Sequence, residues 1–383
     1  MVFILSDRMK TPLGVVPVNL GNKDLKWETT TQTNIGLDLS FFNERISLTT
    51  DWYNKITSDL LIAVQLPLSS GYGTAMRNIG KVRNRGIEFT LNTENIKTKD
   101  FQWSSNFNIA FNRNKVISLA EGYDSYTSIA TFDQNFNSQS SYIAKVGYPI
   151  GMMYGYLYDG VYGVEDFDQT GSTYVLKSTV PNFSGENNTQ PGYAKYRDLN
   201  GDGVINGDDR TIIGKGDPKH IGGFTNNFTY KNFDLSIFLQ WSYGNDIMNA
   251  NKLMFENAFN KKKNLNQFAS YADRWTFENQ SSNIPVASSS PSNMVFSSRI
   301  IEDGSYLRLK TLSLGYTIPS KILKKAHISR MRVYVSAQNL YTWTSYSGYD
   351  PEVSIKNTAL NPGLDFSAYP RAASFTFGVN LNF

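Results

Sequence analysis

The chain has 383 residues and is poor in charge, with 18% charged residues against roughly 25% in an ordinary soluble domain. Asparagine (38 residues) is as frequent as lysine and arginine together (37), and 14% of the residues are aromatic, a composition that favours strands and turns and excludes disorder. Without cysteine, with two isolated histidines (His220 and His327) and with a net charge of +4 from scattered cations, the sequence gives no basis for an enzyme or a nucleic-acid-binding protein.

Apolar runs in the sequence are short. One of the longest, Leu60-Leu61-Ile62-Ala63-Val64, is far below the about eighteen residues of a membrane-spanning helix. Residues 1–10, with Asp7 and Arg8 after a short apolar stretch, do not have the pattern of a signal peptide. The sequence therefore excludes a helical membrane protein but leaves a membrane β-barrel open, because barrel strands alternate and never look strongly hydrophobic.

The first regular element begins near residue 33. Residues 33–41 alternate between apolar and polar side chains, which is the two-residue period of a strand with two different faces. A turn at Asn43-Glu44-Arg45 follows, and residues 46–53 resume the alternation. These two segments predict a β-hairpin.

The same alternation returns along the chain, with asparagine, serine, threonine and glutamine opposite the apolar residues. The segments are residues 87–91, 103–111, 224–230, 233–243, 306–318, 331–338 and 375–383. Short turns near residues 94–99 and at Lys231-Asn232 join two of the pairs. Two stretches are less regular: a change of phase at Lys310-Thr311 predicts a β-bulge, and residues 140–161 fit two strands joined at Gly147-Tyr148-Pro149.

Long polar loops alternate with these tight turns. They are residues 67–81, 120–139, 162–222, 245–299 and 345–371. Short turns on one rim and long loops on the other are typical of outer-membrane barrels, whereas such long loops are uncommon in compact soluble domains. We therefore predict an all-β fold, an antiparallel transmembrane β-barrel of the cell outer membrane with short periplasmic turns and long extracellular loops. The alternative is a soluble secreted β-sandwich that binds carbohydrate and calcium.

The number of predicted strands is odd: eleven if residues 140–161 cross the membrane twice and nine if they do not. Single-chain bacterial barrels usually have an even number, and an open sheet in lipid leaves unpaired backbone groups on two edge strands. We therefore interpret residues 1–32 as an extracellular loop and lead-in, and residues 33–383 as the carboxyl-terminal part of a larger barrel.

Aromatic and charged residues divide between the two predicted strand faces. Aromatics near strand ends on the apolar face, which predict interfacial girdles, are Trp52, Trp103, Trp241, Tyr341 and Trp343. Sugar stacking is the alternative role for aromatic residues that face the lumen or the loops. Charged residues on the polar face are Asp38, Asp51, Glu88, Asp234 and Arg332. No residue can be assigned to catalysis or to a substrate from this pattern.

Residues 198–209, within the loop at 162–222, match a twelve-residue calcium loop at positions 1, 3, 5 and 6. The candidate ligands are Asp198, Asn200, Asp202, Val204 and Asp209. Position 12 is aspartate in place of the usual glutamate, which predicts weaker bidentate closure. We expect a structural Ca²⁺ that orders the loop, and the alternative is a cluster of Asn-Gly and Asp-Gly turns in a solvated loop.

Several motifs in the chain point to a known family. In order, they are residues 24–30 (DLKWETT), 34–38 (NIGLD), 84–89 (NRGIEF), 154–160 (YGYLYDG), 217–224 (DPKHIGGF), 271–275 (YADRW), 305–310 (SYLRLK) and the terminal Phe383. Together they resemble SusC/RagA-type TonB-dependent receptors of Bacteroidota outer membranes, and the resemblance extends from about residue 19 to the end of the chain.

The resemblance implies a barrel of about 22 strands with an amino-terminal plug, energised by TonB and capped by a SusD-like lipoprotein that captures glycans or peptides. This chain would supply about eleven strands and the extracellular loops of a nutrient importer. We find no plug, TonB-contacting segment or signal peptide in the sequence, so we expect TonB to act through the missing amino-terminal part. The expected partners are the SusD-like lipoprotein, the lipid bilayer and an oligosaccharide or peptide substrate, without nucleic acid.

Overall fold

The computed structural model describes residues 21–65, 71–72, 74–78, 80–119, 122–133, 136, 139–184, 188–257, 266–324, 327–356 and 358–383. The first 20 residues of the predicted 1–32 lead-in lie outside this described part. The remainder of the lead-in ends earlier than predicted, because the first strand starts at Thr29.

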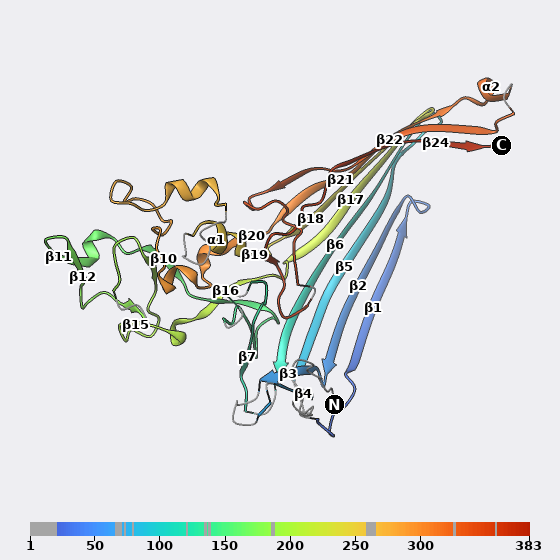
Figure 1. Ribbon diagram of the computed structural model, residues 1–383. Helices are drawn as coiled ribbons and strands as arrows, with labels where there is room; N and C mark the ends of the chain where they lie inside the picture. The colour runs from blue at the N-terminus through green and yellow to red at the C-terminus, as the bar shows by residue number, and fades with distance from the viewer. Residues whose placement is uncertain are drawn as a thin grey trace, which may run out of the picture.

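Nine long strands form one antiparallel sheet in which spatial neighbours follow sequence order (Figure 1). They are β1 (Thr29–Phe41), β2 (Ile46–Ser58), β5 (Lys81–Lys97), β6 (Phe101–Ser118), β17 (His220–Tyr230), β18 (Phe233–Tyr243), β21 (Tyr306–Ile318), β22 (Arg330–Thr344) and β24 (Ser374–Asn382). The all-β prediction and the alternating segments are confirmed. β6 and β17 are direct neighbours although residues 119–219 separate them in sequence.

The strand count is the lower of the two that the sequence allows. Residues 140–161 do not add two strands to the sheet, as the count of eleven required. They form β8 (Tyr142–Lys145), β9 (Met152–Gly155) and β10 (Tyr158–Val161), three short strands outside the large sheet. The physical reason is visible in their burial, since Tyr142, Ile143 and Met153 are enclosed by other loops rather than by neighbouring long strands.

Tight connections gather at one end of the sheet, which we call the turn end. Phe42, Asn43 and Glu44 connect β1 to β2 with φ values of 55°, 56° and 65°, and Lys231, between β17 and β18, has a φ of 53°. The carboxyl terminus and helix α2 (Ser320–Leu323), which belongs to the β21–β22 connection, lie at the same end (Figure 1). The predicted turns at residues 43–45 and 231–232 are therefore confirmed, whereas the turn predicted near residues 94–99 lies at residues 98–100, because β5 continues to Lys97.

The predicted bulge is also confirmed. The register of β21 shifts between Leu309 and Thr311 against β22, and the pairing of β18 with β21 shifts at the same height. Asn339 on β22, which lies opposite this shift, has a φ of 52°. Since one extra residue restores the alternation, Leu309 and Leu312 face the same side of the sheet despite their odd spacing.

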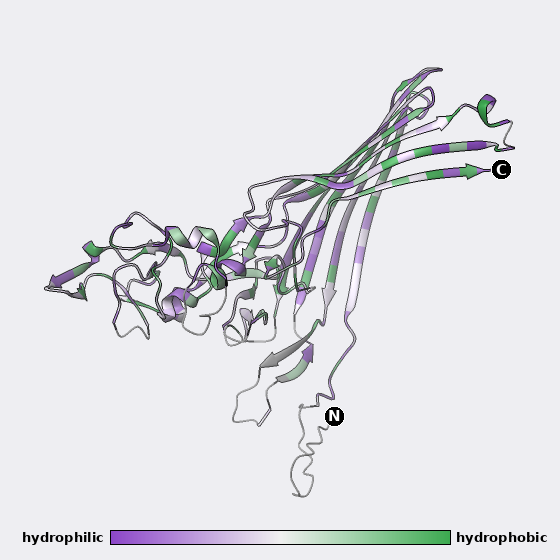
Figure 2. Cartoon of the chain, turned by 45° about the horizontal axis from the view of Figure 1, so that its top comes forward, coloured by the Kyte–Doolittle hydropathy of each residue, from purple (hydrophilic) through white to green (hydrophobic). Residues whose placement is uncertain are grey.

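The two faces of the sheet differ in polarity, as the alternating colours along the long strands in Figure 2 show. Exposed large apolar side chains mark the outer face, and they include Ile35, Leu37, Trp52, Leu314, Tyr341, Trp343, Phe375, Phe377, Val379 and Leu381. On the other face, which we call the inner face, lie the charged residues predicted there, Asp38, Asp51, Glu88, Asp234 and Arg332. Apolar side chains exposed along a whole face are expected where lipid replaces water.

The long connections meet at the opposite end of the sheet, which we call the loop end (Figure 1). Their short strands are β3 (Leu61–Gln65), β4 (Thr74–Asn78), β7 (Ser125–Ser128), β11 (Phe167–Thr170), β12 (Thr173–Leu176), β13 (Asn182–Phe183), β14 (Ala194–Tyr196), β15 (Val204–Ile205), β16 (Thr211–Lys215), β19 (Asp246–Asn249), β20 (Ile301–Asp303) and β23 (Leu364–Asp365). The helical turns are α1 (Ala250–Phe255), η3 (Val164–Asp166), η4 (Gly207–Asp209), η6 (Ala269–Asp273), η7 (Pro291–Met294) and η8 (Ser298–Ile300). A separate apolar core holds these loops together, with Phe136, Tyr142, Met153, Met248 and Phe296 almost fully buried.

Within the described residues, β1 and β24 are the two edge strands of the sheet and do not pair with each other. The soluble sandwich is not the fold observed, because among the described residues no second sheet covers the exposed apolar outer face. Within the same residues, no helix is both long enough and apolar enough to cross a membrane.

Candidate functional site

The predicted calcium loop lies at the loop end and is built around turns that its aspartates cap. The Asp198 carboxylate accepts hydrogen bonds from the backbone N–H groups of Gly201 (2.6 Å) and Gly203 (2.8 Å), and Asp202 accepts one from Val204 (2.8 Å). These backbone bonds, that of Gly203 first, lower the pKa of Asp198. Gly201 and Gly203 adopt φ values of 78° and 82°, so the sequence pattern Asn-Gly-Asp-Gly is needed for the turn itself.

Asp209 closes the loop from its far end. Its carboxylate is fully buried and accepts the backbone N–H groups of Leu199 (2.7 Å) and Asn206 (2.8 Å). The oxygen donors suit a hard cation in type. In this conformation, however, no group of three or more His, Cys, Asp or Glu side chains in the described part of the chain is arranged to hold a metal ion. The calcium site at Asp198, Asn200, Asp202, Val204 and Asp209 stays a prediction.

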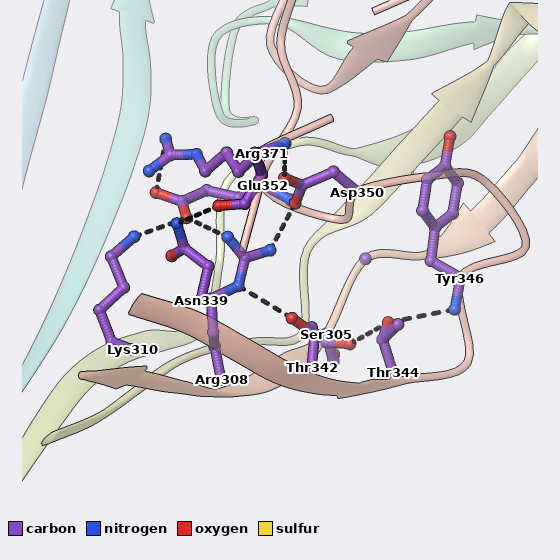
Figure 3. Close-up of polar contacts among 12 residues, drawn as sticks. Ser305, Arg308, Lys310, Asn339, Thr342, Thr344, Tyr346, Asp350, Glu352 and Arg371 are labelled. Carbon is purple, nitrogen blue, oxygen red and sulfur yellow. Dashed lines mark hydrogen bonds and ion pairs between the residues drawn. The ribbon is translucent and has the colours of Figure 1, made fainter. Parts of the chain in front are cut away.

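A buried ion-pair network joins the last long loop to the inner face of the sheet (Figure 3). Arg308 of β21 is its centre, with a side chain only 3% exposed. Its guanidinium lies 2.5 Å from Asp350 Oδ1 and 3.2 Å from Glu352 Oε2, and its Nε donates to Thr342 Oγ1 on β22 (3.0 Å). Both acids belong to the loop between β22 and β24, so their ion pairs with Arg308 hold this loop against the inner face of the sheet.

Two further cations complete the network. Arg371 lies 2.9 Å and Lys310 3.5 Å from the Glu352 carboxylate. Burial alone raises the pKa of Asp350, but hydrogen bonds from the Glu352 N–H and from Arg308 outweigh it and hold the pKa below the usual value. Asp350 therefore remains charged at neutral pH, and three cations face two carboxylates within a mostly buried cluster.

The inner face of the first strands carries a polar hollow of about 540 Å³. It is lined by Gln32, Asn34, Asp51, Trp52, Tyr53, Lys55, Asn84, Glu88 and Asn112. The Tyr53 hydroxyl and Asn112 Oδ1 are hydrogen-bonded at 3.1 Å across β5, and a Cβ on Gly86 would lie 2.5 Å from that hydroxyl. Gly86, in the motif NRGIEF, therefore leaves the space that the Tyr53 ring occupies on the inner face of the sheet.

A larger cavity of about 890 Å³ lies among the loops. Its lining includes the amides Asn249, Asn251, Asn266 and Gln267 and the aromatic residues Phe255, Phe268, Tyr349 and Tyr369. Both charged groups of the lining are paired: Lys252 with Glu302 (2.9 Å) and Glu256 with Arg299 (2.6 Å). The cavity therefore offers neutral hydrogen-bonding groups and aromatic rings, and Tyr349 and Tyr369 are 83% and 93% exposed.

The aromatic residues of the girdle prediction all lie on the outer face of the sheet, and their role at a membrane interface stays a prediction. Trp103 lies near the turn end of the outer face and stacks on Phe228, with ring centroids 5.7 Å apart. Trp52, Trp241, Tyr341 and Trp343 lie on the same face toward the loop end. The Arg308 network was missed by sequence reasoning, because its acids lie in a loop without periodicity. The only indication of this network in the sequence was Arg308 itself, an arginine on the polar face of the predicted strand whose alternation changes phase.

Comparison with protein families matches residues 10–205 to the model described as TonB dependent receptor-like, beta-barrel. TonB-dependent receptor P3 of Formosa agariphila is 37% identical over 375 residues, which cover 97% of this chain and 36% of that protein. TonB-dependent receptor SusC of Bacteroides thetaiotaomicron is 30% identical over 368 residues, covering 94% of this chain and 32% of that protein. The chain thus spans about a third of the length of these curated relatives.

Among solved structures, the chain resembles the one described as the RagAB peptide transporter. The TM-score is 0.78 at 25% identity, and the match covers 100% of this chain and 38% of that one. The matched region includes the nine-stranded sheet together with its loops.

Proposed function

The chain belongs to the TonB-dependent receptor β-barrel family of bacterial outer membranes, and from this premise we propose that it supplies part of the wall and the extracellular loops of a SusC/RagA-type nutrient importer. In this orientation the turn end is periplasmic, the loop end is extracellular, the outer face meets lipid and the inner face lines the transport path. The free edges β1 and β24 pair with the remaining strands of the complete barrel, since unpaired backbone groups are costly in lipid.

The observation that carries the proposal is the cavity of about 890 Å³ among the loops. Its two charged lining groups are neutralised by partners, and most of the remaining lining residues carry amides, hydroxyls or aromatic rings, of which those of Tyr349 and Tyr369 are exposed. Such a surface suits an uncharged chain of hydroxyl groups, because amides exchange hydrogen bonds with hydroxyls and rings cover apolar sugar faces. We therefore propose neutral oligosaccharides as the preferred class of substrate.

An oligopeptide is the second candidate. It is favoured by the likeness to the RagAB peptide transporter, and peptide backbones would also satisfy the amides of the cavity. A SusD-like lipoprotein would close the cavity from outside, where Tyr349 and Tyr369 stand exposed, and TonB would act through the plug of the complete receptor.

Uptake of labelled substrate by the native bacterium tests the proposal. Replacing both Tyr349 and Tyr369 with alanine is expected to reduce oligosaccharide uptake about tenfold, which corresponds to a loss of about 1.4 kcal/mol of binding. Tyr123→Ala is the control, because Tyr123 is an exposed tyrosine on a loop that does not line the cavity. Reduced peptide uptake with unchanged sugar uptake would assign the peptide class, and unchanged uptake of both at normal receptor levels would contradict the role of the cavity.

A further inference from the structure

Four cations meet on the outer face at the loop end of β5 and β6. Arg85 is the cross-strand partner of Arg113, and Arg83 is the partner of Lys115. Directly opposed side chains of an antiparallel pair have Cβ atoms about 5 Å apart, and like charges at this spacing destabilise a sheet. We call these four residues the basic row. Two successive like-charge pairs therefore lower the stability of the isolated protein.

The orientation of the basic row follows from its neighbours. Asn114, between Arg113 and Lys115, donates to Asp217 and accepts from the Ile150 N–H on the inner side, and Val82 and Val116 are buried against the loops there. The row therefore points the opposite way, on the side of Ile87 and Phe111.

The described part of the chain provides no acid for the row. None of its four residues forms an ion pair with any described residue, although the same chain pairs Arg308, Arg332 and Lys252 with carboxylates elsewhere. Arg113 is positioned by backbone groups instead, since its guanidinium donates to the carbonyl oxygens of Asn112 (2.9 Å) and Lys219 (2.8 Å). That contact brings exposed Lys219, whose Nζ lies 5.8 Å from the centre of the Tyr243 ring, next to the row.

The height of the row places it beside lipid headgroups. On β6 the apolar outer residues run from Trp103 to Phe111, eight residue steps that span about 27 Å along the strand and about 21 Å along the membrane normal at a tilt near 40°. This length accounts for most of an apolar band of about 25 Å. Arg113 and Lys115 are the next two outward positions, beyond the hydrocarbon.

The aromatic residues at this level support the same assignment. Phe111 lies 5.5 Å from His220 between ring centroids, and His220 stacks on Tyr243 and accepts a hydrogen bond from Trp241 Nε1 (3.1 Å). These rings form the girdle expected at a membrane interface, and the cations stand immediately outside it.

We propose that the basic row binds the phosphate groups of a lipid in the outer leaflet, which in a Gram-negative outer membrane is lipopolysaccharide. Phosphate oxygens between Arg85 and Arg113 would convert two repulsive pairs into shared charge-assisted hydrogen bonds. The acyl chains of the same lipid would lie along Ile87, Phe111 and Trp52. The proposal goes beyond nutrient uptake, because the row lies on the face opposite the transport path.

The test uses the receptor as isolated from the outer membrane in mild detergent, with lipid A micelles as the probe. Replacing Arg85 and Arg113 with glutamine is expected to weaken lipid A binding about 30-fold, because each cation near an anionic surface contributes roughly a fivefold change. Lys55→Gln with Lys99→Gln is the matched control: Lys55 lies at the same height on the inner face and Lys99 at the turn end. Phosphatidylcholine micelles and inorganic phosphate serve as the other ligands.

Selective, salt-sensitive binding of lipid A to the wild type and to the control, lost in the double variant, supports the proposal. Equal binding of lipid A by the double variant, or equal binding of phosphatidylcholine or free phosphate by the wild type, overturns it, as does burial of this face against a second protein. Folding is checked separately: without anionic lipid the double variant should be at least as heat-stable as the wild type, because it loses like-charge repulsion.

Discussion

Arg332 on β22 reaches across β21 to Asp234 on β18, with 2.9 Å between Arg332 Nε and Asp234 Oδ1. The side chain passes over Gly315, where a Cβ would lie only 2.4 Å from the guanidinium. Three neighbouring strands near the periplasmic turns are therefore tied together by one ion pair that depends on a missing side chain between its partners.

Gly315→Val is expected to displace Arg332 from Asp234 and to destabilise the barrel by about 1–2 kcal/mol, since both side chains are partly exposed. The midpoint of heat-modifiable gel mobility measures the change. Gly36→Ala is the control, because its Cβ would meet only the end of the Asp51 side chain. A midpoint equal to that of the wild type would show that Arg332 can reach Asp234 by another path.

Arg308→Met should release the loop between β22 and β24. It leaves the Asp350 and Glu352 carboxylates inside the cluster without their main partner, and breaking such a buried pair costs about 3–5 kcal/mol. Limited proteolysis should then cut within residues 345–371. Lys310→Met is the milder counterpart, because Lys310 contacts Glu352 only at 3.5 Å. Protection of the loop in both variants alike would argue against an anchoring role for Arg308.

The stability given by Asp350 should depend on pH. Its pKa in the folded protein is below the ordinary value of 3.8, so its contribution is present above about pH 4 and is lost as the pH falls through the lower folded value. The difference in melting temperature between wild type and Asp350→Asn should therefore be large at pH 7 and shrink toward pH 3. Asp168→Asn, at an exposed loop carboxylate, is the control. A difference that grows on acidification would contradict the sign.

Calcium should protect residues 198–210 from proteolysis if the loop binds the ion. Replacing Asp198 and Asp202 with alanine should abolish this protection, and a chelator should abolish it in the wild type. Asp208→Ala is the control, since Asp208 belongs to the same loop but not to the proposed ligand set. Wild-type cleavage that ignores both calcium and chelator would leave only the turn-forming role of these residues.

The large sheet could be predicted from the sequence because each of its strands repeats the same local pattern, an alternation of apolar and polar side chains. Residues 33–41 and 375–383 alternate strictly, and even the bulge at Lys310-Thr311 is visible as a change of phase. For residues 140–161 this pattern gave a wrong prediction, because a few alternating residues fit a strand of the large sheet as well as a short strand in the core of the loops. Their burial against Met248 and Leu364 depends on segments that lie far away in the sequence.

Candidate sites were harder to predict than the fold. The calcium loop is contiguous, so its residues could be named directly, and their convergence on an ion stays a prediction. Arg308 and Asp350 are 42 residues apart, so the sequence does not indicate their contact. Arg85 and Arg113 can be recognised as neighbours only when the register of β5 and β6 is known. Cations that look scattered in the sequence thus form a row in the structure.

The pairing of β6 with β17 makes the loops separable from the wall. Residues 119–219 leave the sheet after β6 and return to the adjacent position, so β6 and β17 pair directly and this segment inserts no described strand between them. A receptor built this way can exchange or lengthen its ligand-facing segments as cassettes while its membrane-embedded frame is inherited unchanged.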